Sequence, residues 1–113
     1  MIQVYHNPRC SKSRCALTHL EGKGISYQVV DYLNEDITVD QLKGVISLLK
    51  IKPFDLIRQG EEVYKTLYKG KQLSDEEWIE VMVNNPKLIE RPIVIHNDRA
   101  VVARPTELID TIL

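Results

Sequence analysis

The sequence predicts an α/β fold, with one small, mixed four-stranded sheet flanked by helices. The chain opens with a strand, a helix and a second strand, continues with apolar residues at helical spacing, and ends with two strands and a helix. Its 113 residues are enough for one domain and too few for two. We therefore expect a single domain over residues 1–113.

The first part of the chain predicts a strand-helix-strand unit. Residues 2–5 are typical of a short strand, and the next four residues of a turn. A helix fits residues 11–23 and ends at Gly24, before a second strand over residues 25–32. Two strands joined by a helix predict a parallel pair.

The middle of the chain predicts helices only. They are residues 39–49 with Thr38 as N-cap, residues 54–68 broken at Gly60, and a helix that residues 74–77 open and residues 84–86 stop.

The last part predicts a hairpin and a helix. Residues 91–95 and 99–103 flank a three-residue loop, which suits an antiparallel hairpin. Pro105 can begin a final helix through residue 113. Its expected inward residues are Leu108, Ile109 and Ile112. The whole order is a thioredoxin-like layout, with a helical insert between a β-α-β half and a β-β-α half.

Composition and charge exclude several classes of partner. Fifteen Lys and Arg against sixteen Asp and Glu give a formal charge of -1, which argues against a broadly basic nucleic-acid surface. No apolar run approaches the roughly 18 residues of a membrane span. The amino terminus lacks the pattern of a secretory signal, so we expect a cytoplasmic protein.

Cys10 is the candidate reactive residue, because it stands between the first strand and the first helix. A thiol there meets unpaired N–H groups and the positive end of the helix dipole, which stabilise the thiolate and lower the thiol pKa. Arg9 and Arg14 add positive charge nearby, and His6 can add charge or hydrogen-bond the sulfur. This position favours a reactive Cys10 over a small buried hydrophobe.

Cys15 is expected to be a core-facing thiol, with a resolving role as the alternative. On an ideal helix it lies roughly 8–9 Å from Cys10, beyond the roughly 7 Å that a disulfide spans. Ser13 takes the second position of a C-x-x-C motif, so a single reactive thiol would need an external reductant. Two cysteines without nearby ligands predict no metal site.

Five segments, spread in order over nearly the whole chain, resemble the glutaredoxin-dependent arsenate reductases. They are residues 6–14 (HNPRCSKSR), 56–58 (LIR), 85–86 (NP), 90–94 (ERPIV) and 103–107 (ARPTE). The resemblance implies that Cys10 is the nucleophile, that His6 helps to lower the thiol pKa and that Ser13 hydrogen-bonds the sulfur. Matched in the same way, the oxyanion-binding residues are Arg58, Arg91 and Arg104.

The chemistry of arginine agrees with this match, because a planar, permanently charged fork suits a tetrahedral oxyanion. The peptide before Pro92 matches the family's cis-proline position. Arg99 is expected to lie on the hairpin surface instead.

The resemblance implies reduction of arsenate to arsenite through a covalent intermediate on Cys10. Glutathione would be the co-substrate and glutaredoxin the protein partner, with no bound cofactor. We expect no nucleic acid or membrane partner, and a monomer that serves arsenic detoxification.

Three other functions stay open. The first is a glutathione-dependent thiol reductase with a substrate other than arsenate. The second is a Spx-type redox regulator that binds RNA polymerase, although those regulators generally carry the C-x-x-C that Ser13 breaks. The third is a structural or binding domain, for which an unreactive Cys10 would be the sign.

Overall fold

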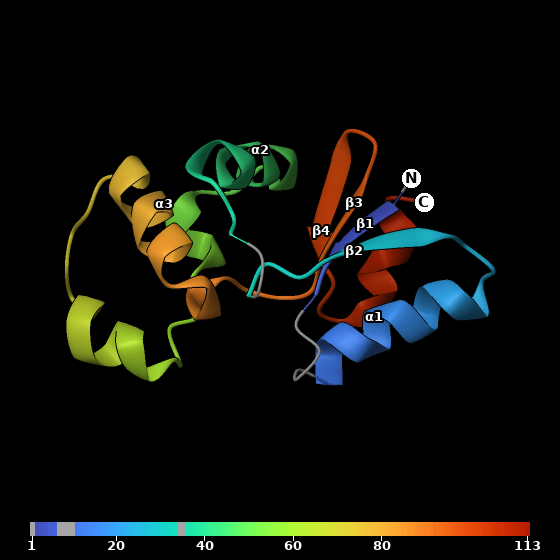
Figure 1. The fold of residues 1–113 in the computed structure, drawn as a ribbon, viewed down its shortest axis with the longest axis horizontal. Coiled ribbons are helices and arrows are strands. Elements are labelled where there is room, and N and C mark those ends of the chain that lie inside the picture. Colours follow the sequence, from blue (N-terminus) through green and yellow to red (C-terminus); the bar gives the residue numbers. More distant parts are fainter. Residues whose placement is uncertain (1, 7–10, 34–35) are drawn as a thin grey trace. The chain divides into compact units, whose positions relative to one another are not determined.

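A computed structural model describes residues 2–6, 11–33 and 36–113, apart from the side chain of Lys12. The elements follow the predicted order (Figure 1). They are β1 (Ile2–Tyr5), α1 (Ser11–Gly22), β2 (Tyr27–Val30), α2 (Val39–Leu49), η1 (Pro53–Leu56), η2 (Tyr64–Tyr68), α3 (Asp75–Asn84), η3 (Pro86–Leu88), β3 (Ile93–His96), β4 (Arg99–Val102) and η4 (Thr106–Thr111). Of the short helices, η2 is a π-helix and the others are 3₁₀.

The four strands form the predicted mixed sheet, in the order β2-β1-β3-β4. The β1–β2 pair is parallel, as expected for strands joined by α1. The β1–β3 and β3–β4 pairs are antiparallel. The sheet and the β-α-β and β-β-α halves on either side of a helical insert confirm the predicted fold class.

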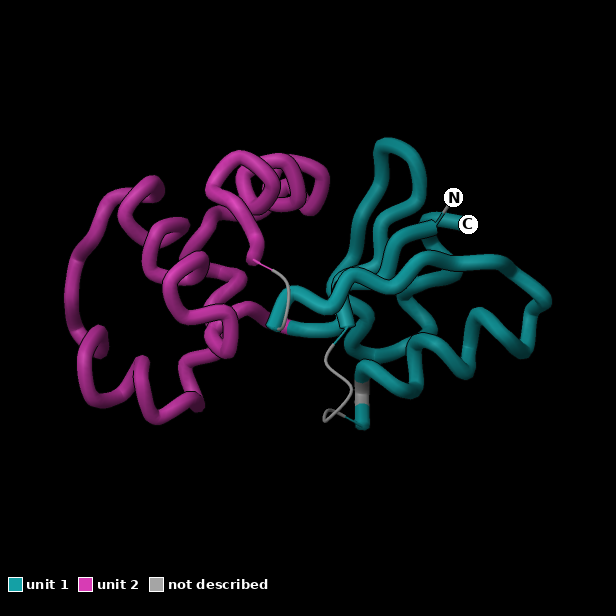
Figure 2. The backbone as a smooth tube through the Cα atoms, viewed as in Figure 1, with its two compact units in different colours: residues 1–35, 91–113 teal, residues 36–90 magenta. Residues whose placement is uncertain are grey.

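The chain forms two compact units, coloured separately in Figure 2. The sheet unit comprises residues 1–35 and 91–113, and the insert unit comprises residues 36–90. The insert thus leaves the sheet unit after β2 and returns to it at Arg91. A single domain over residues 1–113 stays a prediction.

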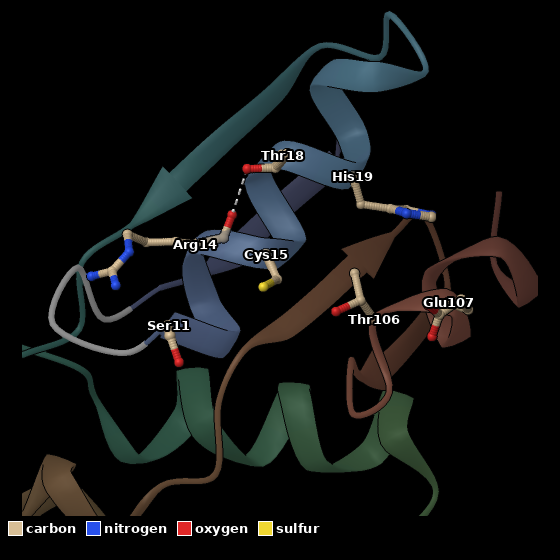
Figure 3. A pocket seen from close by; sticks show the side chains of 7 residues that line it. All are labelled: Ser11, Arg14, Cys15, Thr18, His19, Thr106 and Glu107. Atoms are coloured by element: carbon tan, nitrogen blue, oxygen red, sulfur yellow. Dashed lines mark hydrogen bonds between the residues drawn. The ribbon is translucent and has the colours of Figure 1, made fainter.

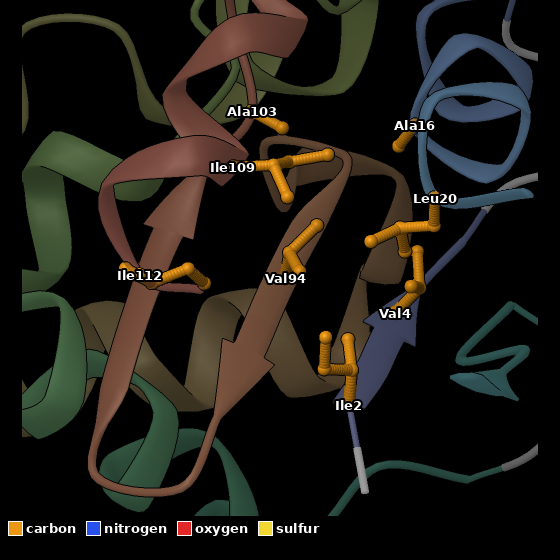
Figure 4. Packing of buried hydrophobic residues seen from close by; sticks show 8 residues of the cluster. All are labelled: Ile2, Val4, Ala16, Leu20, Val94, Ala103, Ile109 and Ile112. Carbon is orange, nitrogen blue, oxygen red and sulfur yellow. The ribbon is translucent and has the colours of Figure 1, made fainter. Parts of the chain in front are cut away.

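The core of the sheet unit lies between the sheet and two helices, α1 and η4. Alternation along β1 sends Ile2 and Val4 to one face, and α1 covers them with residues such as Leu20. Figure 4 shows how these side chains converge. The full cluster is Ile2, Val4, Ala16, Leu20, Val94, Ala103, Ile109 and Ile112.

Two capping boxes set the starts of helices in the insert unit. The Thr38 hydroxyl accepts a hydrogen bond from the Gln41 amide at 3.0 Å, and Ser74 accepts one from Glu77 at 3.2 Å. Both N-caps satisfy amides that have no partner within the helix. The structure confirms the predicted N-cap at Thr38 and the predicted start of a helix at residues 74–77, whereas the capping box at Thr38 was not predicted.

Aromatic side chains pack together inside the insert unit. The Trp78 ring centroid lies 5.1 Å from that of Phe54 and 6.5 Å from that of Tyr64. This contact joins α3 to the short helices η1 and η2, between which the predicted helix over residues 54–68 is interrupted.

The second strand and the hairpin turn differ from their predicted boundaries. The strand expected over residues 25–32 is shorter, as β2 covers only Tyr27–Val30. The hairpin turn has two residues, not three, because His96 pairs with Arg99 in the ladder. Asn97, with φ of 57°, makes the tight turn possible, since asparagine tolerates the left-handed region.

The final helix is 3₁₀ rather than α, and this corrects one predicted core residue. Ile109 and Ile112 are buried as expected, but Leu108 is 37% exposed. A 3₁₀ helix has three residues per turn, so residues 109 and 112 share a face that residue 108 does not.

Candidate functional site

Cys10, the predicted nucleophile, lies outside the described residues. The described chain resumes at Ser11, the first residue of α1. Of the other five predicted site residues, four belong to the sheet unit and Arg58 belongs to the insert unit.

His6 is a buried imidazole that directly follows β1. Its backbone N–H donates to the Val30 carbonyl at 3.1 Å, which continues the β1–β2 pairing by one residue. The side chain is 7% exposed, and its Nδ1 has no hydrogen-bond partner among the described residues. This nitrogen is therefore available to a group outside the described part of the chain.

Burial lowers the pKa of His6 below its ordinary value of 6.5. The Asp31 carboxylate and a hydrogen bond to the Ser13 backbone oppose this shift, whereas the positive charge of Arg14 adds to it. The direction favours a neutral imidazole at neutral pH. A neutral imidazole can still form hydrogen bonds but adds no positive charge to its surroundings.

Ser13 lies in the first turn of α1 and is fully buried. It shares the inward face of the helix with Ala16 and Leu20, at spacings of three and seven residues. The hydroxyl is therefore fixed by the packing of α1. Its hydrogen bond to the Cys10 sulfur stays a prediction.

Arg91 and Arg104 are brought together by the hairpin. The register pairs Ile93 with Val102, and continuing it by two residues sets Arg91 opposite Arg104. The Nε–H of Arg104 donates to the Arg91 carbonyl at 2.7 Å. Two of the three predicted oxyanion-binding residues are thus neighbours, although thirteen positions separate them in the sequence.

The prolines beside these arginines also adopt a defined geometry. The Arg91–Pro92 peptide is cis, as predicted. The Arg104–Pro105 peptide is also cis, which the sequence analysis did not anticipate. Arg99 is exposed on β4, as expected for a hairpin-surface residue.

Arg58 follows η1, on a segment held by backbone contacts to the last residue of η3 and the residue after it. Ile57 forms an antiparallel bridge with Ile89, and the Arg58 amide donates to the Leu88 carbonyl at 2.7 Å. This pairing places the guanidinium between two carboxylates, those of Glu61 and Glu90. Neither contact was predicted from the sequence, although Glu61 stands three residues after Arg58 and Glu90 directly precedes Arg91.

The prediction that Cys15 faces the core is wrong, because its thiol is exposed. The inward face of α1 is set by Ser13, Ala16 and Leu20, and a residue next to Ala16 lies about 100° away around the helix. Cys15 instead lines a pocket of about 460 Å³ between α1 and the start of η4, shown in Figure 3. The lining residues are Ser11, Arg14, Cys15, Thr18, His19, Thr106 and Glu107.

The described residues form no cluster of metal ligands and no helix suited to cross a membrane. Within them, no three His, Cys, Asp or Glu side chains gather closely enough to hold a metal ion. None of the helices in the same ranges combines the length and apolar character that crossing a bilayer requires.

The sequence profile of the ArsC family matches residues 5–112. The chain belongs to the ArsC family. The match runs from the last residue of β1 to the end of η4, so it includes Cys10 and all the other predicted site residues.

Individual ArsC relatives align over almost the whole chain. An uncharacterised protein of Escherichia coli (strain K12), YfgD, is 43% identical, covering 94% of this chain and 91% of that protein. An arsenate reductase of Neisseria meningitidis serogroup A is 38% identical, covering 99% and 97%. The solved structure of an arsenate reductase from Vibrio cholerae has a TM-score of 0.95 at 44% identity, covering 99% and 97%.

Proposed function

We propose that the protein is a thiol-dependent arsenate reductase. The observation that carries this proposal is the pairing of Arg91 with Arg104 in a chain of the ArsC family. Two arginines held next to each other by the hairpin supply permanently charged forks that are suited to a tetrahedral oxyanion. Relatives from Neisseria meningitidis and Vibrio cholerae that bear the name arsenate reductase support the choice of arsenate.

In the proposed reaction, the Cys10 thiolate attacks the arsenic of arsenate. A sulfur–arsenic bond forms, an arsenic–oxygen bond breaks, and the leaving oxygen departs as water. Arg58, Arg91 and Arg104 offset the charge that develops on the oxyanion. His6 and Ser13 stabilise the thiolate by hydrogen bonds to the sulfur.

The second step reduces arsenic by two electrons. The glutathione thiolate attacks the Cys10 sulfur, the electron pair of the sulfur–arsenic bond passes to arsenic, and arsenite leaves. The resulting mixed disulfide on Cys10 is reduced by glutaredoxin, which restores the thiol. We propose that the protein acts in the cytoplasm as a single-domain monomer and needs no bound cofactor.

Coupled turnover of arsenate tests this function. The protein is supplied with glutathione, glutaredoxin and a recycling reductase, and arsenite release is measured. The wild-type protein is expected to turn over, Cys10→Ser to have no activity, and Cys15→Ser to keep its activity. Turnover that survives Cys10→Ser would exclude Cys10 as the nucleophile.

The same preparation separates arsenate reduction from general thiol reduction. A glutathione mixed disulfide offered in place of arsenate should be a poorer substrate by kcat/KM. A preference for the mixed disulfide would instead assign the protein as a glutathione-dependent thiol reductase.

A further inference from the structure

Arg58 is the predicted oxyanion-binding residue that lies between two resident negative charges. Its Nη1 is 3.9 Å from Oε1 of Glu61, and its Nε is 3.8 Å from Oε1 of Glu90. The backbone fixes the second pairing, because the Arg58 amide donates to Leu88 and the Glu90 amide donates to Leu56, at 2.7 and 2.9 Å.

These contacts act through charge and not through hydrogen bonds. Both separations exceed the roughly 3.2 Å of an N–H···O hydrogen bond. The carboxylates therefore do not use the N–H donors of Arg58, and its buried Nη1 has no hydrogen-bond partner among the described residues. Arg58 can still donate hydrogen bonds to a ligand while its positive charge is compensated.

The three side chains are partly buried, so water screens their charges incompletely. The exposed fractions are 23% for Arg58, 29% for Glu61 and 27% for Glu90. Two carboxylates, and not one, lie beside the Arg58 guanidinium. An anion that reaches Arg58 meets hydrogen-bond donors together with a repulsive field.

We propose that Glu61 and Glu90 determine the charge selectivity of the oxyanion site. They favour a singly charged tetrahedral anion over a doubly charged anion of the same shape, because repulsion from a fixed charge grows in proportion to the ligand's charge. This inference rests on the proposed function, which places Arg58 in the oxyanion site.

The test compares two ligands at one pH. Dihydrogen arsenate is the monoanion at a pH below the second ionisation of arsenate and above the ionisation of glutamate, where sulfate is a dianion. Titration calorimetry of the Cys10→Ser protein gives the Kd of each without turnover. The same titrations are done with Glu61→Gln and Glu90→Gln added singly and together.

The expected effect is unequal for the two ligands. Replacing one carboxylate by its neutral isostere should lower the Kd of dihydrogen arsenate about twofold and the Kd of sulfate about fourfold. A dianion has twice the interaction energy of a monoanion with the same fixed charge, and doubling the energy squares the fold-change in Kd. Glu62→Gln is the matched control, because Glu62 is exposed and its carboxylate contacts Thr66 rather than Arg58. It should leave both Kd values unchanged.

A structural role for the glutamates would not change the ratio of the two Kd values. Equal changes for both ligands, or weaker binding in both Gln variants, would overturn the inference. Arg58→Gln separates this failure from failure of the proposed site. If Arg58→Gln leaves both Kd values unchanged, the assignment of Arg58 to the oxyanion site is wrong. If it weakens both while the Gln variants keep their ratio, only the charge selectivity is wrong.

Discussion

The guanidinium of Arg104 donates its Nε–H to the backbone carbonyl of Arg91, at 2.7 Å. This contact engages the Nε–H of the guanidinium with one backbone acceptor. The side chain of Arg104, which follows β4, is thereby held by the backbone of Arg91, which precedes β3. The contact therefore holds the Arg104 side chain beside the residue that the hairpin register sets opposite it.

Arg104→Lys should lower kcat/KM for arsenate by about tenfold or more, with the fold retained. Lysine keeps the charge but has no Nε–H edge, so one ammonium cannot reproduce both the contact to Arg91 and a forked contact to an oxyanion. Steady-state kinetics over a range of arsenate concentrations measures the change.

Arg99→Lys is the control for Arg104→Lys, because Arg99 is an exposed arginine of the same hairpin. Its kcat/KM should stay near that of the wild-type protein. Equal losses in the two variants would show that general positive charge on the hairpin, and not the fork of Arg104, supports turnover.

His6 should make stability fall as the pH drops below 6.5, the ordinary pKa of histidine. Burial lowers the pKa of His6 in the folded protein, so between that lowered value and 6.5 the unfolded chain binds more protons. Protonation therefore favours unfolding over this range, and the effect is complete below the folded pKa. Denaturant unfolding of the wild-type protein and His6→Gln at several pH values measures the difference.

NMR titration of the histidine ring protons checks the cause. The His6 resonance, assigned by its loss in His6→Gln, should have its midpoint below 6.5. A midpoint at or above 6.5 would contradict the neutral imidazole and restore positive charge as its contribution to the site.

Ile109→Ala should destabilise the protein by about 2–5 kcal/mol, because it removes a fully buried side chain from the core of the sheet unit. Leu108→Ala should change stability by less than about 0.5 kcal/mol, since its side chain is 37% exposed. Chemical denaturation of the two variants tests directly which face of η4 packs against the core. Similar losses for both would indicate that an α-helix, and not a 3₁₀ helix, ends the chain.

Cys15 should react with a chromogenic disulfide reagent in the folded protein, because its thiol is exposed. The Cys10→Ser protein isolates this thiol and should titrate as about one thiol per chain without denaturant, whereas adding Cys15→Ser should abolish the signal. Reaction only after unfolding would show that the Cys15 thiol is buried in the core instead. Cys15→Ser alone should alter stability by less than about 0.5 kcal/mol.

The fold was predictable because local signals agreed with the tertiary structure. Thr38 and Ser74 are polar caps at the start of amphipathic segments, and the structure uses both. Boundaries were less predictable where tertiary contacts decide them. The turn at Asn97 depends on a left-handed residue, and η4 depends on which of its side chains reach the core.

The candidate site was predictable in its residue types and only partly in its environment. The cis peptide before Pro92 and the exposed position of Arg99 follow the sequence analysis. The outward position of Cys15 was not predicted, because the sequence does not show which side of a helix a single cysteine occupies. The carboxylates around Arg58 were missed because one of them, Glu90, lies thirty-two positions away and meets it only through the bridge between Ile57 and Ile89.

The shortness of the turn at Asn97 has a consequence at the far end of the hairpin. In an antiparallel hairpin the length of the turn sets the pairing register of the two strands. The two-residue turn therefore sets Arg91 opposite Arg104 and no other residue. An added residue at the tip would offset every pair below it and point the second guanidinium to the opposite side. The length of this exposed turn thus matters to the facing of the two arginines as much as the arginines themselves.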